Sequence, residues 1–171
     1  LRRDVKSFTD YLPDGYVTDG SVDYTTHFQA AITANYGNAI EMPAGGAYKV
    51  GTLSITGAIS ILGNQQAKLL AIGPRLFRVP TPSAIDGLVI DGIFATNLGV
   101  AGGGDNNCIG VFVDVGASIL NSCIRNNTLI GFGIGMSLVG LLTPKTYTDA
   151  YGGSYVTTGN DGRNFVTGNI I

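Results

Sequence analysis

The sequence predicts an all-β solenoid, a chain that winds into stacked coils of short parallel strands. Three observations predict it: the composition, the spacing of strand-like runs and a self-similar pattern. Charged residues make up 13% of the 171, glycine occurs 26 times, and Glu41 is the only glutamate. Good helix formers are therefore scarce, which argues against a helical bundle or a coiled coil.

The short strand-like runs are rich in branched and aromatic residues and are separated by Gly, Pro and Asn at intervals of a few residues. This spacing leaves little room for crossover helices, which argues against a doubly wound sheet. The predicted strands lie within residues 39–42, 48–55, 59–62, 68–72, 76–79, 88–94, 109–115, 118–124 and 134–138.

The self-similar pattern is an apolar, small, apolar alternation that returns along the chain. Residues 89–94 can be laid over 119–124 at an offset of 30, and over 165–170 at a further 46. The alternation predicts Ile90, Gly92 and Phe94 on one face of a strand. A coil of this length with tight polar turns is typical of a parallel β-helix, whereas a Greek-key sandwich does not predict the repeat.

The same offset superposes Thr96-Asn97 on Asn126-Asn127, which predicts stacked asparagine side chains. The excess of 16 residues before the third copy is attributed to a loop insertion at about 143–159.

One helix is expected, from about residue 24 to residue 36, where the apolar residues follow a period of 3.6 that changes to 2 after Gly37. Asp23 stands where an N-cap belongs and Gly37 is a plausible stop. The apolar positions of this helix share one face: Tyr24, Phe28, Ala31 and Ile32. The predicted organisation is a lead-in of residues 1–22 with turns at Pro13-Asp14-Gly15 and Asp19-Gly20, a capping helix at 23–37, and coils over 38–171.

Charge and cysteine content exclude several classes of partner. A formal net charge of −2 gives no footprint for nucleic acid or an anionic membrane. Cys108 and Cys123 lack metal-ligand spacing and are expected as buried free thiols. The apolar stretch 129–142 is shorter than the roughly 20 residues of a spanning helix, so no membrane insertion is predicted.

The opening of the chain carries a family resemblance. From Asp19 it reads DGSVDYTTHFQAAI, then IEMPAGGAYKV and TLSI, ending at Ile55. This order resembles the start of pectate-lyase-like right-handed β-helices: an Asp-Gly turn, a short helix ending Phe-Gln-Ala-Ala-Ile, and a strand into Pro-Ala-Gly-x-Tyr. With YLPDGY upstream, it is most similar to bacteriophage tailspike proteins, over roughly residues 11–55.

That resemblance implies a homotrimer in the phage tail, assembled in the host cytoplasm and extracellular when acting. It would contact other virion proteins through its N-terminal side, and recognise and often cleave bacterial surface polysaccharide, capsule or O-antigen. It also implies that this chain is a piece of a longer one. Two alternatives stay open: a non-catalytic structural or adaptor segment of the tail, and a secreted bacterial polysaccharide lyase or glycosidase of the same fold.

Glycan hydrolysis needs two carboxylates, about 5–5.5 Å apart for retention or about 6.5–9.5 Å for inversion. The acids on the predicted coils form no ladder, because the counterparts of Asp91 are Asn121 and Thr167. The catalytic residues therefore stay unknown, with the active site expected outside this segment or between chains. No cofactor and no metal site is predicted. The acids considered are Asp86, Asp91, Asp105 and Asp114.

Two further features of the sequence bear on chemistry. His27, the only histidine, lies on the predicted helix without the partners of a catalytic triad. Tyr147, Tyr151 and Tyr155 are spaced by four in the insertion. They can stack on sugar rings, pack within the loop, or contact another chain.

Overall fold

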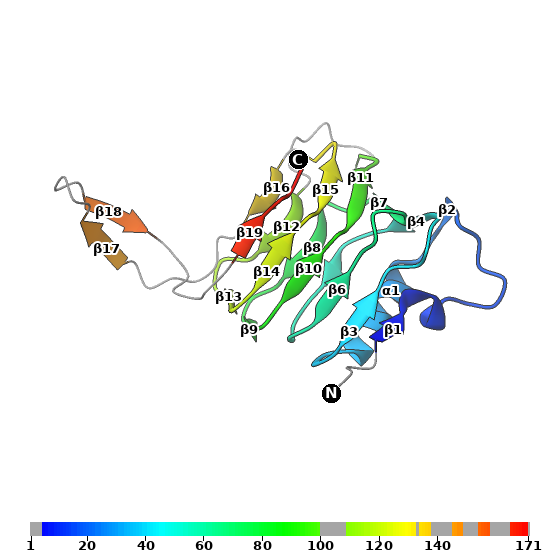
Figure 1. The fold of residues 1–171 in the computed structure, drawn as a ribbon, viewed down its shortest axis with the longest axis horizontal. Coiled ribbons are helices and arrows are strands. Elements are labelled where there is room, and N and C mark those ends of the chain that lie inside the picture. The colour runs from blue at the N-terminus through cyan, green and yellow to red at the C-terminus, as the bar shows by residue number, and fades with distance from the viewer. Residues whose placement is uncertain are drawn as a thin grey trace.

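The computed structural model describes residues 5–99, 109–132, 134–137, 145–148, 154–157 and 165–170. It consists mostly of parallel β-strands in stacked sheets with one α-helix, which confirms the predicted all-β class (Figure 1). Of the residues described, none lies in a helix long and apolar enough to cross a membrane.

The described strands form three parallel sheets and two separate pairs. The first sheet contains, in spatial order, β1 (Val5–Ser7), β3 (Ala39–Glu41), β6 (Ser60–Leu62), β10 (Val89–Asp91), β14 (Cys123–Arg125) and β19 (Phe165–Thr167). The second contains β2 (Asp19–Asp23), β4 (Ala47–Val50), β7 (Lys68–Ala71), β11 (Phe94–Asn97) and β15 (Thr128–Ile130). The third contains β5 (Leu53–Ser54), β8 (Arg75–Val79), β12 (Ile109–Val113) and β16 (Ile134–Ser137).

The chain visits these sheets in the same order on every pass: β3, β4, β5, then β6, β7, β8, then β10, β11, β12. A short parallel pair, β9 (Ala84–Asp86) with β13 (Ser118–Leu120), adds a fourth side. Each pass therefore stacks on the previous one, an arrangement compatible with a parallel solenoid. The remaining pair, β17 (Lys145–Thr148) and β18 (Ser154–Thr157), is antiparallel and lies within the predicted insertion at 143–159.

The inward side chains form columns across the coils. In the first sheet Ile40, Ile61, Ile90 and Ile124 are paired in register and are at most 1% exposed. In the second sheet the corresponding buried column is Tyr48, Leu69, Ala95 and Leu129. Each coil buries its inner face on the next, so the stack shares one continuous apolar core.

The predicted repeat of 30 is wrong for the middle copy. Val89 pairs with Cys123, an offset of 34, and Cys123 pairs with Phe165, an offset of 42. The counterpart of 89–94 is therefore 123–128. The positive-φ turn residue is Gly92 in the first copy and Gly168 in the third, but Asn126 in the middle, at φ values of 70°, 64° and 55°. Asparagine tolerates this backbone region, so it can take the place of glycine at the turn. A pattern that requires a small residue there does not recognise Asn126, and it therefore placed the middle copy in the wrong register.

The predicted strand face is also wrong. The turn at Gly92 interrupts the alternation, so Ile90, Ile93 and Ala95 face the core, each at most 1% exposed. Phe94 lies outside, with the Lys68 ammonium 5.4 Å from its ring centroid.

Asparagine side chains do stack, but of the predicted positions only Asn127 takes part. Asn97 is paired with glycine rather than asparagine on the next coil and donates to the Gly131 carbonyl. The stacked amides are instead Asn127 and Asn169, where Asn127 Nδ2 donates to Asn169 Oδ1 at 3.0 Å. Asn127 is 1% exposed.

The helix α1 (Thr25–Ala34) is shorter than predicted, and its apolar stripe is buried as predicted: Tyr24, Phe28, Ala31 and Ile32 are at most 2% exposed. The N-cap residue is Tyr24, not Asp23. Asp23 lies one residue earlier and accepts from the Thr25 N–H at 2.9 Å. The 3-10 helix η1 (Phe8–Tyr11) packs beside α1, with the rings of Phe8 and Phe28 stacked at 4.4 Å.

The helix also closes the edge of the coil that contains β4 and β5, at the N-terminal end of the stack (Figure 1). An edge strand leaves its N–H and C=O groups without a neighbouring strand. Here Gln29 takes the place of that strand, because its side-chain amide accepts from the Ser54 N–H at 2.7 Å and donates to the Ser54 carbonyl at 2.8 Å. Three further contacts complete the closure: the Tyr24 N–H on the Lys49 carbonyl, the Thr25 hydroxyl on the Gly51 N–H, and the Tyr36 hydroxyl on the Thr56 N–H.

Residues 5–7 and 19–22 of the predicted lead-in join the sheets in β1 and β2, and β2 also takes in Asp23 from the predicted capping segment. The predicted turn at Pro13–Gly15 is present: the Tyr16 N–H donates to the Pro13 carbonyl, and Gly15 has φ 72°. Asp19-Gly20 is not a turn between elements. It lies inside β2, where the register with β4 shifts and Gly20 has φ 77°.

Candidate functional site

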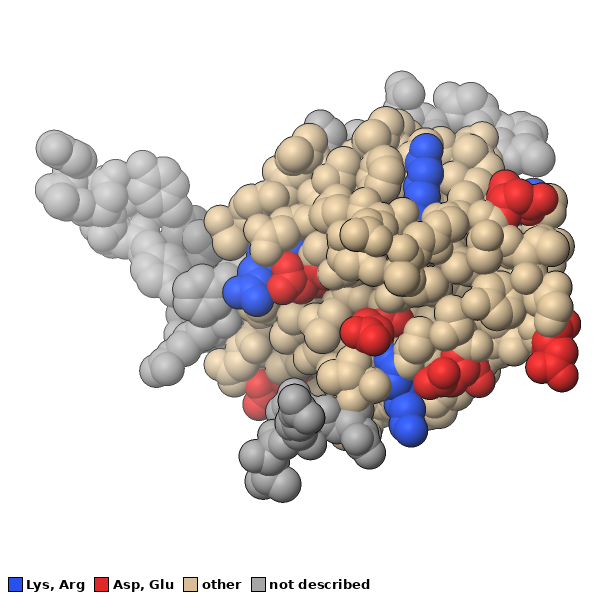
Figure 2. Space-filling model, turned by 45° about the vertical axis from the view of Figure 1, so that its right-hand side comes forward, with Lys and Arg blue, Asp and Glu red and all other residues tan. Residues whose placement is uncertain are grey.

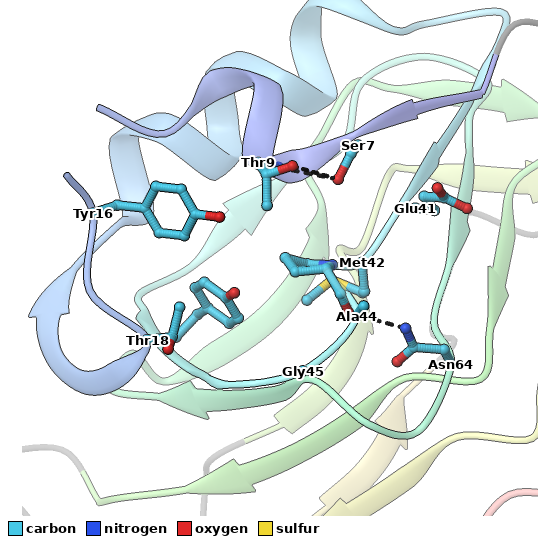
Figure 3. A pocket seen from close by; sticks show the side chains of 11 residues that line it. Ser7, Thr9, Tyr16, Thr18, Glu41, Met42, Ala44, Gly45 and Asn64 are labelled. Atoms are coloured by element: carbon cyan, nitrogen blue, oxygen red, sulfur yellow. Dashed lines mark hydrogen bonds between the residues drawn. The ribbon is translucent and has the colours of Figure 1, made fainter. Parts of the chain in front are cut away.

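A cavity of about 570 Å³ lies at the N-terminal end of the stack, bounded by η1, the ends of β1 and β3, and the chain that follows β3 (Figure 3). The β1–β3 pairing places Ser7 directly opposite Glu41. The lining residues are Ser7, Thr9, Tyr16, Thr18, Glu41, Met42, Pro43, Ala44, Gly45, Tyr48 and Asn64.

Polar side chains from different segments converge on this cavity. Tyr16 directs its hydroxyl into it from one side and Glu41 lies on the other, with Thr9 and Ser7 between them along the upper wall (Figure 3). The Thr9 hydroxyl donates to the Ser7 hydroxyl at 2.8 Å. Glu41 is the only charged residue of the lining, and its exposed carboxylate has no hydrogen-bond or ion-pair partner in the part of the chain that the structure describes.

Tyr48 is the buried aromatic member of the lining. Its ring packs against Phe28 and Tyr24, with centroids 5.8 and 6.3 Å away, and the residue is 1% exposed. Its hydroxyl has no hydrogen-bond partner among the described residues. Burial raises the pKa of the Tyr48 phenol, so the hydroxyl stays protonated and can both donate and accept.

The wall opposite η1 is held in shape by Asn64. Its Nδ2 donates to the Pro43 carbonyl at 2.9 Å, and its Oδ1 accepts from the N–H groups of Gln66 and Ala67. The Met42 N–H donates to the Leu62 carbonyl at 2.7 Å, so this wall is tied to the next coil. The cavity is therefore preformed rather than dependent on a loose loop.

The candidate acids that the structure describes do not line the cavity, and they form hydrogen bonds with other residues. Asp91 accepts from Arg125 Nε at 2.9 Å and from Asn126 Nδ2 at 3.0 Å. Asp86 accepts from Asn121 Nδ2 at 2.8 Å. Each contact crosses to the adjacent coil, so these carboxylates join coils.

Asp114 is the most enclosed of these acids, at 9% exposure. Both of its oxygens accept from Arg78 Nε at 3.0 Å, and Arg78 Nη2 also contacts Oδ2. The hydrogen bonds from Arg78 hold the pKa of Asp114 below its ordinary value. Asp105 lies outside the described residues, and the described part of the chain holds no cluster of potential metal ligands.

The remaining candidate residues that the structure describes lie outside the cavity. His27 Nδ1 lies 3.0 Å from the Tyr11 carbonyl, which ties α1 to η1. Cys123 is a free thiol but only half-buried, because it begins β14 on the outer side of the sheet. Tyr147 and Tyr155 are directly opposite each other in the β17–β18 register. Tyr151 and Cys108 lie outside the described residues.

The surface has no single-sign patch on the face shown in Figure 2, where acidic and basic residues are scattered over a largely uncharged surface. Comparison with family models, curated proteins and solved structures finds no match to this chain.

The cavity itself was not predicted from the sequence. Its residues come from segments separated by turns and share no periodicity. Two features of the sequence lie in it: Glu41 is the only glutamate of the chain, and Tyr48 ends the run Pro-Ala-Gly-Gly-Ala-Tyr, one residue longer than the family pattern Pro-Ala-Gly-x-Tyr.

Proposed function

We propose that this chain is the part of a bacteriophage tailspike in which a right-handed parallel β-helix begins, and that the protein recognises bacterial surface polysaccharide, capsule or O-antigen. The observation that carries the proposal is the closure of the first coils by α1. The segment that forms this closure is the one whose sequence resembles tailspike openings, residues 11–55.

The stacking of the coils supports the proposed fold. Successive strands of one sheet are parallel and are joined by passes through the other sheets. Crossover connections between parallel strands are right-handed in about 98% of cases, which favours the right-handed form.

The groups around the cavity support a glycan as the partner. Sugars are recognised by aromatic faces together with hydroxyl, amide and carboxylate groups. Tyr16, Tyr48, Thr9 and Glu41 supply these groups, on a scaffold whose coils offer an extended surface for a long polymer.

Depolymerisation by the complete trimeric protein is the enzymatic part of the proposal. Asp86, Asp91 and Asp114 are bound to partners on adjacent coils, so we assign the cleavage to other carboxylates, outside this segment or between chains. The hydrogen bonds of these three acids to adjacent coils stabilise the stack. They therefore favour a second candidate function, a structural or adaptor segment of the phage tail.

The test combines binding, cleavage and mass. The protein is incubated with a panel of purified capsules and O-antigens, binding is measured by interferometry, and new reducing ends are assayed. We expect binding to one polysaccharide class, released oligosaccharides, and a trimer by light scattering. Binding without products favours the adaptor, and a monomer that releases products favours a secreted enzyme. No binding to any polysaccharide contradicts the proposal.

A further inference from the structure

We propose that the cavity between η1, β3 and Tyr16 binds one pyranose unit that carries no carboxylate, a neutral hexose or an amino sugar. The inference rests on the proposed function for the source of the sugar, and it deepens that function by naming the unit and the residues that hold it. The cavity lies beside the helix-capped end of the stack.

The Tyr48 hydroxyl offers a ligand one hydrogen-bonding group in the lining of the cavity. Tyr48 is 1% exposed as a residue and lines the cavity, and its hydroxyl has no partner among the described residues. Among those residues Thr96 Oγ1 is the one buried side-chain oxygen without a partner, so the Tyr48 hydroxyl opens onto the cavity. A sugar hydroxyl placed there can both donate to this group and accept from it.

Glu41 sets the charge that the cavity accepts. Its carboxylate is unpaired within the described chain and is the only charge in the lining. A carboxylate accepts hydrogen bonds from sugar hydroxyls and attracts an ammonium group, but it repels a uronate or a sialic acid. The site therefore selects against acidic sugars.

Tyr16 supplies an aromatic surface for the ring. The residue is 37% exposed, and its backbone is fixed on both sides. The Tyr16 N–H donates to the Pro13 carbonyl at 3.1 Å, and the Val17 N–H donates to the Tyr24 hydroxyl at 2.9 Å. Tyrosine has only two side-chain torsions, so it loses little conformational entropy when it packs on a ligand from a fixed backbone.

The volume of about 570 Å³ lies inside the range of roughly 300–1,000 Å³ that small-molecule sites occupy. Ser7, Thr9 and Thr18 add hydroxyl groups around the same space. The lining thus combines an aromatic surface, hydroxyl donors and acceptors, and one carboxylate.

The test is an NMR titration of the protein with methyl glucoside, methyl galactoside, glucosamine and glucuronate, each to about 50 mM, where a site with a Kd near 1 mM is nearly filled. We expect shift changes confined to residues 7–9, 16–18 and 41–48 with at least one of the first three sugars. Glucuronate should give none. No such changes with any neutral or amino sugar, or binding of glucuronate alone, overturns the proposal.

Matched variants identify the groups involved. Tyr48→Phe removes only the hydroxyl, breaks no bond in the described chain, and should weaken binding about 2- to 10-fold at an unchanged Tm. Glu41→Gln should weaken glucosamine binding more than methyl glucoside binding. The controls Tyr36→Phe and Asp86→Asn, which lie outside the cavity, should leave affinity unchanged. Equal effects of the control and cavity variants overturn the assignment.

The polysaccharide experiment separates this inference from the proposed function. If the protein binds a polysaccharide and Tyr48→Phe leaves both that affinity and the monosaccharide shifts unchanged, the cavity assignment fails and the proposed function stands. If monosaccharides fill the cavity while no polysaccharide binds, the site stands and the tailspike function fails.

Discussion

The capped edge at β5 and the turn after β14 solve the same problem with side-chain amides. At the edge, Gln29 accepts from the Ser54 N–H at 2.7 Å and donates to the Ser54 carbonyl at 2.8 Å. At the turn, Asn127 accepts from the Ile93 N–H at 2.9 Å and donates to the Ile90 carbonyl at 3.1 Å. In both places a side-chain amide pairs with a backbone N–H and a backbone C=O.

The two regions differ in what lies beyond the amide. Gln29 is half-buried on a helix, and its remaining contact is with Thr33 of that helix, so the ladder stops there. Asn127 is fully buried and donates to Asn169, which in turn donates to the Ile124 carbonyl. The same amide group therefore terminates the stack when a helix presents it, and continues the stack when a turn presents it.

The largest expected effect is loss of the cap itself. Phe28→Asp places a carboxylate where the ring stacks on Phe8 at full burial, and should cost at least about 4 kcal/mol, leaving the protein unfolded or aggregated. Ala30→Asp, on the exposed face of the same helix, is the control. A soluble Phe28→Asp protein with unchanged melting by circular dichroism would contradict the cap.

The buried asparagine should come next. Asn127→Ala removes the partner of the Ile93 N–H and the amide bond to the Ile90 carbonyl, and should cost about 2–4 kcal/mol in urea unfolding. Asn97→Ala, which removes a more exposed amide between neighbouring coils, should cost under about 1 kcal/mol. Equal losses for the two variants would show that burial does not distinguish the amides.

The ion pair between coils predicts a pH effect of intermediate size. Because Arg78 lowers the pKa of Asp114 in the folded state, the pair stabilises the fold above the ordinary aspartate value of 3.8. That stability is lost as the pH falls through the lowered pKa. Asp114→Asn should cost about 1–2 kcal/mol at pH 7 and flatten the acid side of a stability–pH curve. Asp14→Asn, an exposed control, should change neither.

The smallest effect is expected at the terminating amide. Gln29→Leu should cost about 1 kcal/mol, because the Ser54 groups lose their partner at a half-exposed edge that water can reach. Gln66→Leu, at an exposed position away from α1, serves as the control in the same thermal melts. If Gln29→Leu lowered the free energy of unfolding as much as Asn127→Ala does, the amide at the edge of the stack and the amide within it would not differ in their contribution to stability.

The sequence predicts those parts of the fold in which apolar residues recur at a regular local spacing. The apolar stripe of α1 and the short runs of the sheets depend on local patterns of buried residues, and the structure confirms them. The coil length was predicted wrongly because the coils are unequal: Ala47 pairs with Lys68 at one end of the stack, and Cys123 with Phe165 at the other. An apolar, small, apolar pattern cannot set a register when Asn126 replaces glycine at a left-handed position.

The cavity was beyond prediction for a related reason. Ser7 and Glu41 meet through strand pairing, and Tyr16 reaches the same space from a turn, so nothing in their spacing connects them. The Gln29 contact is similar: the helix was visible in the sequence, but the pairing of its amide with Ser54 depends on how the helix sits against β5. Local patterns in the sequence predict helices and strands. To predict the contacts between them, the pairing register of the strands must also be known.

The most direct test of this account is hydrogen exchange at the Ser54 and Ile93 amides, measured by NMR in the unmodified protein and in Gln29→Leu. The account predicts that both amides are protected, and that Gln29→Leu releases Ser54 while Ile93 stays protected. A Ser54 amide that already exchanges at the unprotected rate, or a variant that releases both amides equally, would contradict it.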